Sequence, residues 1–584
     1  MKLAKIKAKR GEIMAYFLKQ THNKKGTYLQ IYSSFYNPEK KQTSHKSFKP
    51  IGYVDDLKKQ GISDPISYYK EEIEKMNADR QSKIRDEKAQ KVSDTLPIKY
   101  YGYFPIRSIN NRLGLDRDLC ILQLQYNFKF NVFELLSSLV YARVISPCSK
   151  HKTFFDVLPY LIDETSFSRD QMYEGLRFLG IEYKRIIEIY NHKIQLIYGR
   201  NTDHTYFDCT NFFFEIDKED DLRRKGPSKE KRTDPIVGMG LLLDNKQIPI
   251  GMKIYPGNMS EKPIYREVIQ ELKDRNNIKG KTIRVADKGL NCTANIMDAI
   301  LCGDGYLFSK SVKTLPEKEK TWVLLDNDYV EVKDKKGNLL YKTKSCIDEF
   351  PYMLTDNDGK KTKVMLCEKR VVTYNPSLAK KQIAEIDKEV NKALNASLSS
   401  AKRAEYGSKS KYMEFITVDK DGKGTDDNVK ISVNMKAVEK AKRLAGYNLL
   451  VTSEVKMTDE EIYNNYHNLW RIEESFRMMK SAFDARPVYL QREDSIIGHF
   501  LICYIAVLLM RLLQIEELDD QFGYQELIDY MRSATAVDLK GKYMVNLTKK
   551  SDVMLRLKKK IGRPIDNYYL TNGDIKNILN YKFR

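Results

Sequence analysis

Hydrophobic residues follow two different spacings along the chain, one typical of helices and one of strands. Between residues 105 and 200, the stretches FELLSSLVYARVIS and YKRIIEIYNHKIQLIYG place apolar residues three and four positions apart. This spacing predicts amphipathic helices, and it indicates a helical domain over residues 96–200.

The chain ahead of this helical domain has another pattern. Residues 27–36, TYLQIYSSFY, alternate polar and aromatic positions as strands do, and the pattern breaks at Asn37-Pro38. Residues 66–95 are highly charged with helical spacing, which predicts a connecting helix. Residues 1–95 are therefore expected to form a small β-rich unit followed by a linker helix.

Strand-like runs begin after residue 200. Three of them, at 204–217, 235–244 and 247–258, are separated by turn residues and predict an antiparallel meander. Behind them the pattern predicts a helix, a strand, a helix and a strand, at 261–275, 281–289, 294–302 and 305–310. This order is that of a ribonuclease-H-like core, a mixed sheet covered by helices.

The rest of the chain interrupts and then completes that order. Residues 311–445 contain Lys-rich strand-like segments and a charged helix, which indicates a β-rich insertion. Residues 446–515 resume with an apolar strand, GYNLLVTSE, and residues 516–584 form a basic C-terminal region. We therefore expect a multidomain α/β protein whose ribonuclease-H-like core is split between residues 201–310 and 446–515.

Positive charge is concentrated at the two ends of the chain. The net charge is +22, while residues 1–50 carry 12 Lys and Arg against 2 Asp and Glu, and residues 540–584 carry 12 against 3. Such ends fit arms that lie along phosphates and gain affinity by releasing counterions. The alternative for either end alone is a solvated surface.

Several features bear on the compartment. The eight cysteines form no CxxC pair, so neither a structural zinc site nor a disulfide framework is indicated. MKLAKIKAKR at the start has no apolar stretch of a signal peptide, and the expected location is the cytoplasm, at the nucleoid. The apolar run at 496–510 is short for a membrane span, and we interpret it as a buried core helix, with a membrane helix as the alternative.

Three acidic residues occupy positions where the pattern calls for apolar ones. Asp208 lies inside the strand YFDCT, and Asp287 ends the strand RVADKG. Glu473 lies in YHNLWRIEESFRMMK, on a helix that a Thr458–Glu461 capping box is expected to start. On that helix Glu473 would share a buried stripe with Tyr466 and would need a partner there.

Each acid has an ordinary interpretation when taken singly. The two aspartates could be strand-end carboxylates, and Glu473 could pair with Arg471 or Arg477. Together, two strand carboxylates and one helix carboxylate can converge on divalent ions, and oxygen ligands suit Mg²⁺ or Mn²⁺. The missing partner of Glu473 would then be a metal ion.

These residues resemble a known family. YFDCT, VADKG and the spacing Tyr466, Glu473, Lys480 are similar to the Asp-Asp-Glu transposases of bacterial insertion sequences, in the insertion-sequence-four group with its Tyr-Arg-Glu-Lys signature. The resemblance covers roughly residues 200–510 and includes the β-rich insertion. The signature Arg would fall at Leu469, which is a departure, and Arg471 could supply that phosphate contact.

The resemblance implies a mechanism. Asp208, Asp287 and Glu473 would hold two Mg²⁺ or Mn²⁺ ions, with Asp208 bridging them, and the site would cut DNA and join the freed 3′-hydroxyl to a second strand. Phosphates at the cut end would contact Tyr466, Arg471, Arg477 and Lys480, with Lys288 as a weaker candidate. Trp470 would contact DNA from the same helix, unless it only packs there. Trp322 in the insertion would hold a flipped base, unless it only packs locally.

The resemblance also implies partners. The DNA would carry terminal inverted repeats, recognised by residues 105–200 and the basic N-terminal unit, and two protomers would pair two ends and capture target DNA. Two rivals stay open. One is a catalytically silent DNA-binding relative, and the other is a ribonuclease-H-like nuclease that cuts without joining.

Overall fold

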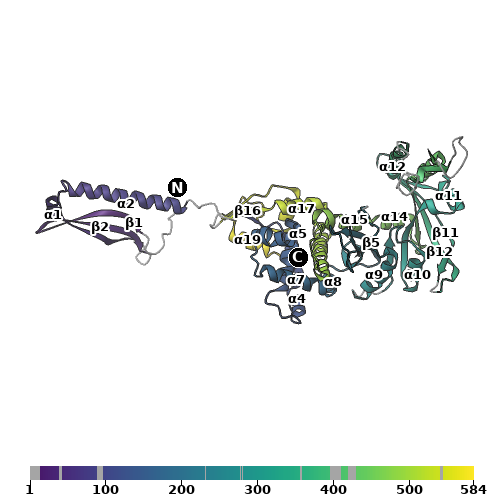
Figure 1. Cartoon of the computed structure of the whole chain (residues 1–584), viewed down its shortest axis with the longest axis horizontal. Coiled ribbons are helices and arrows are strands. Elements are labelled where there is room, and N and C mark those ends of the chain that lie inside the picture. Colours follow the sequence, from purple (N-terminus) through teal and green to yellow (C-terminus); the bar gives the residue numbers. More distant parts are fainter. Residues whose placement is uncertain are drawn as a thin grey trace. The chain divides into compact units, whose positions relative to one another are not determined.

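Two compact units make up the chain in the computed structural model, one over Met1–Leu96 and one over Pro97–Arg584 (Figure 1). The structure describes residues 13–37, 42–88, 97–230, 232–275, 278, 280–355, 358–394, 410–417, 429–538 and 543–583. Each unit is described below by itself.

The first unit is a three-stranded antiparallel sheet with helices. Its elements are β1 (Ile13–Asn23), β2 (Gly26–Asn37), β3 (Gln42–Tyr53), α1 (Val54–Lys59) and α2 (Pro65–Lys88). Gly26 closes the tight β1–β2 turn with φ of +115°, a conformation that favours glycine. Asn77 of α2 bonds both backbone groups of Tyr16, at 2.8 and 2.9 Å, and so fixes the helix against β1.

After the short strand β4 (Ile98–Tyr100), the second unit continues with helices, as the apolar spacing predicts. They are α3 (Phe104–Leu113), α4 (Asp116–Gln123), α5 (Val132–Ile145), α6 (Lys150–Lys152), α7 (Arg169–Ile181) and α8 (Tyr183–Ile197), with a π-helical turn at Thr153–Val157 and a 3₁₀ turn at Leu158–Tyr160. Asn131 caps α5 and Ser168 caps α7 through their side chains, which satisfies backbone N–H groups that a helix start leaves free.

A nine-stranded mixed sheet forms the centre of this unit. Its order is β10-β11-β12-β15-β9-β8-β5-β6-β7, and its strands are β5 (His204–Phe213), β6 (Ile236–Leu243), β7 (Pro249–Pro256), β8 (Ile283–Ala286), β9 (Gly305–Lys310), β10 (Val330–Lys333), β11 (Leu339–Thr355), β12 (Lys361–Tyr374) and β15 (Tyr447–Thr452). The pairs β5–β6 and β6–β7 are antiparallel, which confirms the predicted meander, while β8 is parallel to both β5 and β9.

Helices cover both faces of the sheet. On one face the core includes Phe207 and Cys209 of β5, with α9 (Glu261–Arg275) and α10 (Thr293–Leu301). On the other face Tyr206 and Phe212 of the same strand join the core that α15 (Trp470–Arg477) and α16 (Glu493–Arg511) share. β5 is thus buried on both faces, and this arrangement of helices on a mixed sheet confirms the mixed α/β class.

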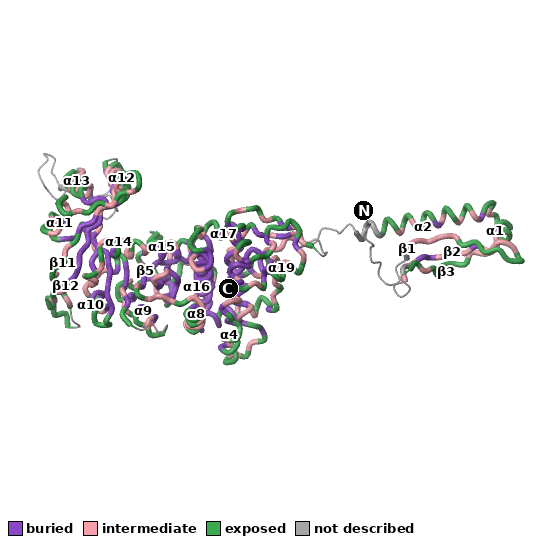
Figure 2. Tube along the Cα trace, turned by 180° about the vertical axis from the view of Figure 1, so that it is seen from behind, coloured by how far each residue is buried: buried purple, intermediate pink, exposed green. Residues whose placement is uncertain are grey.

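The apolar run at 496–510 lies within α16, and its burial confirms the interpretation as a core helix. The helix continues into a π-helical turn, and Glu493–Glu517 is long and apolar enough to cross a membrane, yet 94% of its most apolar window is buried. Figure 2 shows α16 as buried along its length. Gly498 lets α16 approach α7, because a Cβ there would lie 2.1 Å from the carbonyl oxygen of Leu176.

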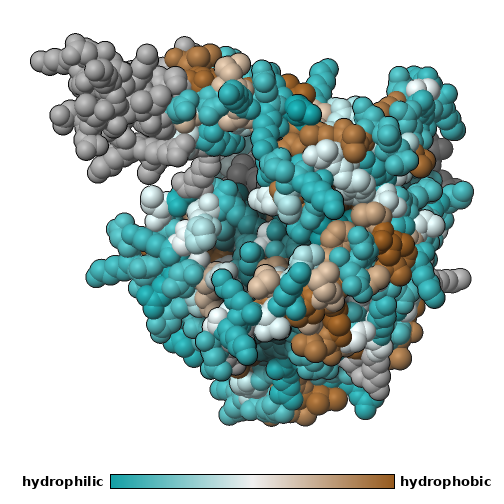
Figure 3. Space-filling view, turned by 90° about the vertical axis from the view of Figure 1, so that its right-hand side faces the viewer, coloured by the Kyte–Doolittle hydropathy of each residue, from teal (hydrophilic) through white to brown (hydrophobic). Residues whose placement is uncertain are grey.

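Residues 311–445 add strands to the central sheet as well as helices beside it. The helices are α11 (Glu317–Leu324), α12 (Pro376–Leu394) and α13 (Met435–Arg443), with a 3₁₀ turn at Val312–Thr314 and a two-stranded sheet of β13 (Met413–Thr417) and β14 (Val429–Val433). The face that this end presents in Figure 3 is mainly hydrophilic, with separate hydrophobic patches.

The C-terminal region packs back onto the start of the second unit. Its helices are α17 (Tyr524–Ser533), α18 (Asp552–Ile561) and α19 (Asn572–Leu579). A four-stranded sheet, in the order β18-β17-β16-β4, joins β16 (Thr535–Asp538), β17 (Tyr543–Asn546) and β18 (Tyr569–Thr571) to β4 (Ile98–Tyr100). All eight cysteines are free.

Candidate active site

Two of the three predicted acids lie side by side on neighbouring strands, Asp208 within β5 and Asp287 directly after β8. In the parallel pairing of β5 with β8, Phe207 lies opposite Ala286. Asp208 directly follows Phe207, and Asp287 directly follows Ala286. The pairing of the two strands therefore brings the backbones of the two aspartates close together. Asp287 also contributes to raising the pKa of Asp208, as expected for neighbouring carboxylates.

The carboxylate of Asp287 is held by two hydroxyl groups. Tyr466 donates to its Oδ1 over 3.1 Å, and Ser309 of β9 donates to the same oxygen over 3.1 Å. Burial, followed by the charge of Asp287, raises the pKa of Tyr466, so this phenol stays protonated and remains a donor. The tyrosine of the predicted signature therefore contacts one of the predicted acids.

The carboxylate of Asp208 lies in a group of charges. Its side chain is 25% exposed, and burial raises its pKa to about 6, although Lys229 acts in the opposite direction. The Lys229 ammonium lies 4.0 Å from Asp208 Oδ1 and 3.4 Å from Glu261 Oε1, at the start of α9. Burial opposes the charge of Lys229, yet these two acids raise its pKa overall.

Lys229 and Glu261 are the site residues that the sequence analysis missed. Lys229 lies in the loop between β5 and β6, where GPSKEKRTD looks like an ordinary charged turn, and Glu261 is one of several acids at helix starts. Neither position breaks a hydrophobic pattern, which was the signal that identified Asp208. Only the folded chain brings them to the same carboxylate.

Glu473 lies differently from the expectation. The sequence analysis placed it on a buried stripe, but Glu473 is exposed, whereas its neighbour Glu474 is partly buried and pairs with Arg511 at 2.6 Å. Within the residues that the structure describes, no group of three or more His, Cys, Asp or Glu side chains is close enough to hold a metal ion. Glu473 therefore lies outside the buried stripe on which the sequence analysis placed it.

The reason is a break in the expected helix. The Thr458–Glu461 capping box starts α14 (Asp459–His467) as predicted, but that helix ends before Asn468. Arg471 N–H bonds Asn468 O over 3.1 Å and Ile472 N–H bonds Leu469 O over 3.1 Å, which are tighter i→i−3 turns. Tyr466 and Glu473 therefore belong to different helices, and Glu473 is exposed although Leu469 and Phe476 of the predicted stripe are buried.

The predicted phosphate contacts divide into buried and exposed groups. Arg471 is buried, pairs with Glu474 at 3.2 Å and with Asp520, and lies over the ring of Trp470. Lys480, in the π-helical turn Met478–Ala482, pairs with Glu230 at 3.4 Å, and its burial lowers its pKa to about 8.

The other predicted contacts are placed as follows. Arg477 and Lys288 are exposed, and Trp470 is 48% exposed on α15. Trp322 is partly buried in the core that covers the α9 face of the sheet, with Lys344 Nζ 5.1 Å from its ring centroid. Leu469, at the position of the expected Arg, is buried in the core.

The donor set fits a divalent cation that prefers oxygen. Asp208 and Asp287 offer carboxylate oxygens, and Glu261 adds a third negative charge. Among the described residues, Lys229 is the only cation within ion-pair distance of Glu261. Asp208 and Glu261 are partly buried while Asp287 is exposed, and neighbouring carboxylates repel one another without a counter-charge. A cation bound at the two aspartates would relieve this repulsion.

Comparisons with known proteins place this site in a family. No curated protein matches the chain. Six chains of solved structures do, among them the cryo-EM structure of a piggyBac transposase synaptic complex with hairpin DNA, at 9% identity over 74% of this chain and 78% of that one, with a TM-score of 0.35.

The model of one protein family also matches the chain. It is described as the transposase DDE domain, and it matches residues 212–509, a range that contains Asp287 and Glu473 and begins just after Asp208. Because these residues are just over half of the chain, the protein belongs to the transposase DDE domain family and is a DNA transposase.

Proposed function

We propose that the protein moves a bacterial insertion sequence of the insertion-sequence-four group by cutting DNA at terminal inverted repeats and joining the element to target DNA. The observation that carries this proposal is that Asp208 and Asp287 directly follow the paired residues Phe207 and Ala286 of β5 and β8, with Tyr466 bonded to Asp287. The strand order β9-β8-β5-β6-β7 supports a ribonuclease-H-like core around them.

In this proposal Asp208, Asp287 and Glu473 hold Mg²⁺ or Mn²⁺. The bound cation supplies stabilisation of charge on the attacking and leaving oxygens of a phosphodiester. Asp287 is oriented for its role by the hydroxyls of Tyr466 and Ser309. Lys229 keeps Asp208 and Glu261 together through its two ion pairs.

We assign DNA contacts to those candidate side chains that are exposed to solvent. Arg477, Lys288 and Trp470 are exposed and are proposed to contact DNA. Arg471 is already paired with Glu474 and Asp520, so we assign it a positioning role that holds α15. Lys480 and Trp322 remain candidates for contact with a strand that enters the site. We propose that two protomers pair two DNA ends, and that the protein works in the cytoplasm.

The experiment that tests the proposal uses a labelled duplex that ends in the element's own inverted repeat, with Mg²⁺ present. Asp208→Asn, Asp287→Asn and Glu473→Gln are compared with the wild type and with two matched controls, Asp203→Asn beside β5 and Glu460→Gln on α14, both exposed. Cleaved strands and joined products are measured on a sequencing gel, DNA affinity by anisotropy, and thermal stabilisation by Mg²⁺ in parallel.

We expect the three site variants to lose cleavage and joining, to bind DNA normally and to lose part of the stabilisation by Mg²⁺, while both controls behave as the wild type. Cleavage without any joined product would instead support a nuclease. DNA binding with no cleavage by the wild type would support a catalytically silent relative. Full activity of Glu473→Gln would show that this acid has been misassigned.

A further inference from the structure

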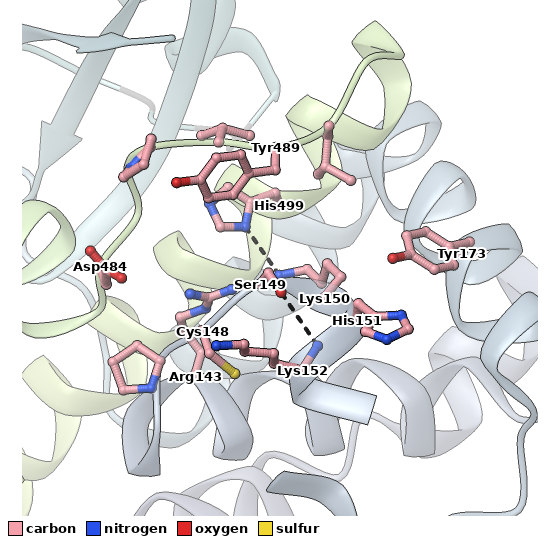
Figure 4. Close-up of a pocket in the computed structure, with 14 residues that line it drawn as sticks. Arg143, Cys148, Ser149, Lys150, His151, Lys152, Tyr173, Asp484, Tyr489 and His499 are labelled. Atoms are coloured by element: carbon pink, nitrogen blue, oxygen red, sulfur yellow. Dashed lines mark hydrogen bonds between the residues drawn. The ribbon is translucent and has the colours of Figure 1, made fainter. Parts of the chain in front are cut away.

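A cavity lies next to the segment that follows the active-site helix. It has a volume of about 560 Å³, which is within the usual range of ligand pockets. One wall comes from the end of α5 and the residues after it, and another from Asp484 and residues 487–490, with His499 of α16 between them (Figure 4). None of the predicted catalytic or phosphate-contacting residues lines it.

Two buried cations line this cavity. Arg143 is 4% exposed and Lys150 is 6% exposed, and neither has an ion pair with a carboxylate among the described residues. Arg143 donates to the carbonyl oxygen of Phe483 over 3.3 Å. Burial and the charge of Arg143 lower the pKa of Lys150 well below its usual value, so a bound anion would favour its charged form. The carboxylate of Asp484 also lines the cavity, but it is exposed and forms no ion pair with either side chain among the described residues. Buried cations are costly, and proteins usually pair them or use them on a ligand.

His499 positions Lys150 without neutralising it. The Lys150 ammonium lies 3.1 Å from His499 Nδ1, and His499 Nε2 lies 3.2 Å from the carbonyl oxygen of Ala485. A carbonyl can only accept, so Nε2 carries the proton and Nδ1 is left to accept from the lysine. Burial and the two cations lower the pKa of His499 well below its usual value, which keeps the ring neutral. The other protons of the ammonium remain for a ligand.

The wall of the cavity is connected to the candidate active site. Arg486 pairs with Glu230, and Glu230 also pairs with Lys480 at 3.4 Å. The residue before Glu230 is Lys229, which lies 4.0 Å from Asp208. A strand held at the aspartates would therefore lie beside Lys229, and a group held in the cavity would lie beside the segment that Arg486 links to Glu230.

We propose that this cavity binds the terminal 5′-phosphate of a DNA strand, with Lys150 and Arg143 as its cationic floor. The inference rests on the proposed function, because adding water across the P–O3′ bond of a strand leaves a 3′-hydroxyl on one piece and a 5′-phosphate on the other. A terminal phosphate can reach side chains this deeply buried, whereas a phosphate inside a duplex cannot, since its neighbours on both sides would have to enter. Tyr489, 69% exposed, lines the cavity and offers a ring for the first base.

The test compares two oligonucleotides of one sequence, with a single-stranded 5′ overhang that ends in either a phosphate or a hydroxyl. Affinity is measured by fluorescence anisotropy without divalent metal, so that nothing is cut. We expect the full-length wild type to bind the phosphorylated strand about tenfold more tightly. Lys150→Met should remove that preference, while Lys129→Met, the same change at an exposed lysine, should keep it.

Each outcome supports or overturns the proposed phosphate site. Equal affinity of the wild type for both strands overturns the proposal, and so does a preference that survives in Lys150→Met. If inorganic phosphate raises the melting temperature but the two strands bind equally, the cavity takes free phosphate rather than a DNA end, and the assignment fails. A parallel cleavage assay with Mg²⁺ separates this failure from a failure of the proposed function.

A measurement on the wild type alone guards against an unstable variant. Lysine acetylation of the full chain is followed by mass spectrometry with each strand present. The phosphorylated strand should protect Lys150 and the hydroxyl strand should not. Equal protection by both strands would overturn the proposal even if Lys150→Met could not be purified.

Discussion

Tyr466 donates its hydroxyl to Asp287 over 3.1 Å, and so a residue of one helix fixes a carboxylate at the end of a strand. The same oxygen accepts from Ser309 at 3.1 Å. Because the phenol already has a partner in the site, its role in this structure is to orient an acid. The sequence analysis assigned it a contact with phosphate, and the two roles lead to different results when the hydroxyl is removed.

Tyr466→Phe tests these roles. If the hydroxyl orients Asp287, the change should reduce metal-dependent cleavage by between roughly tenfold and a hundredfold, raise the Mg²⁺ concentration needed, and leave DNA affinity within about twofold. Tyr463→Phe is the matched control, a tyrosine of the same helix whose ring stacks on Tyr341 at 3.7 Å. Weaker DNA binding with a normal response to Mg²⁺ would favour the phosphate contact instead.

Lys229 gives a second prediction, measured on stability rather than activity. Its ammonium lies 4.0 Å from Asp208 and 3.4 Å from Glu261, so Lys229→Met leaves these acids facing each other without a cation. We expect the variant to melt at a lower temperature without metal and to gain more from Mg²⁺ than the wild type does. Lys246→Met, which breaks a pair with Glu516 elsewhere, is the control. An equal gain from Mg²⁺ in all three proteins would argue against a shared charge cluster.

Much of this site could be predicted from sequence, because Asp208 and Asp287 interrupt apolar strands and the order of strands and helices brings strand ends together. The break at Asn468 and Leu469 could not. Both residues are compatible with a helix, yet the tighter turn there separates α14 from α15, and Glu473 is exposed although Leu469 is buried. Helical spacing assumes one continuous helix, and here two helices follow one another.

The charged residues next to Asp208 could not be predicted from the sequence either. Lys229 and Glu261 are far from Asp208 in the chain, and nothing in their local pattern distinguishes them from surface charges. The segment 311–445 likewise contains regular strand patterns, but pairing of β12 with β15 is what makes it part of the central sheet. Partners that are distant in sequence are set by the fold, so single-chain patterns give the elements more reliably than their contacts.

The buried Arg511 gives a prediction about the support of the active-site helix. Its guanidinium is fully buried, pairs with Glu474 at 2.6 Å and donates to the carbonyl oxygen of Arg471 over 3.0 Å. Arg511→Met should lower the free energy of unfolding by about 3 kcal/mol or more, because it leaves part of Glu474 unpaired. Urea unfolding measures this loss. Adding Glu474→Gln should recover part of it, and Arg556→Met, at an exposed pair, should cost at most about 1 kcal/mol.

Glu271 gives a prediction about pH. Burial disfavours its charge, but hydrogen bonds from Lys184 and Lys253 lower its pKa to about 2. A folded-state pKa below the unfolded value of 4.5 means that the stabilisation is present above pH 4.5 and is lost as the pH falls toward 2. Urea midpoints of the wild type should therefore fall more steeply over this range than those of Glu271→Gln. Parallel curves for the two proteins would show that the carboxylate contributes nothing.

The two tryptophans separate DNA contact from packing. Trp470 is 48% exposed on α15, whereas Trp322 is partly buried against the core. Each single substitution to Phe leaves one indole in the chain, so its fluorescence reports one position. We expect DNA with unpaired bases to quench Trp470 in Trp322→Phe and to leave Trp322 unchanged in Trp470→Phe. Trp470→Ala should then weaken binding of that DNA by about fivefold or more, since a stacked base contributes about 1–3 kcal/mol. Quenching of Trp322 alone would move the contact to the β-rich segment, where the family resemblance first placed it.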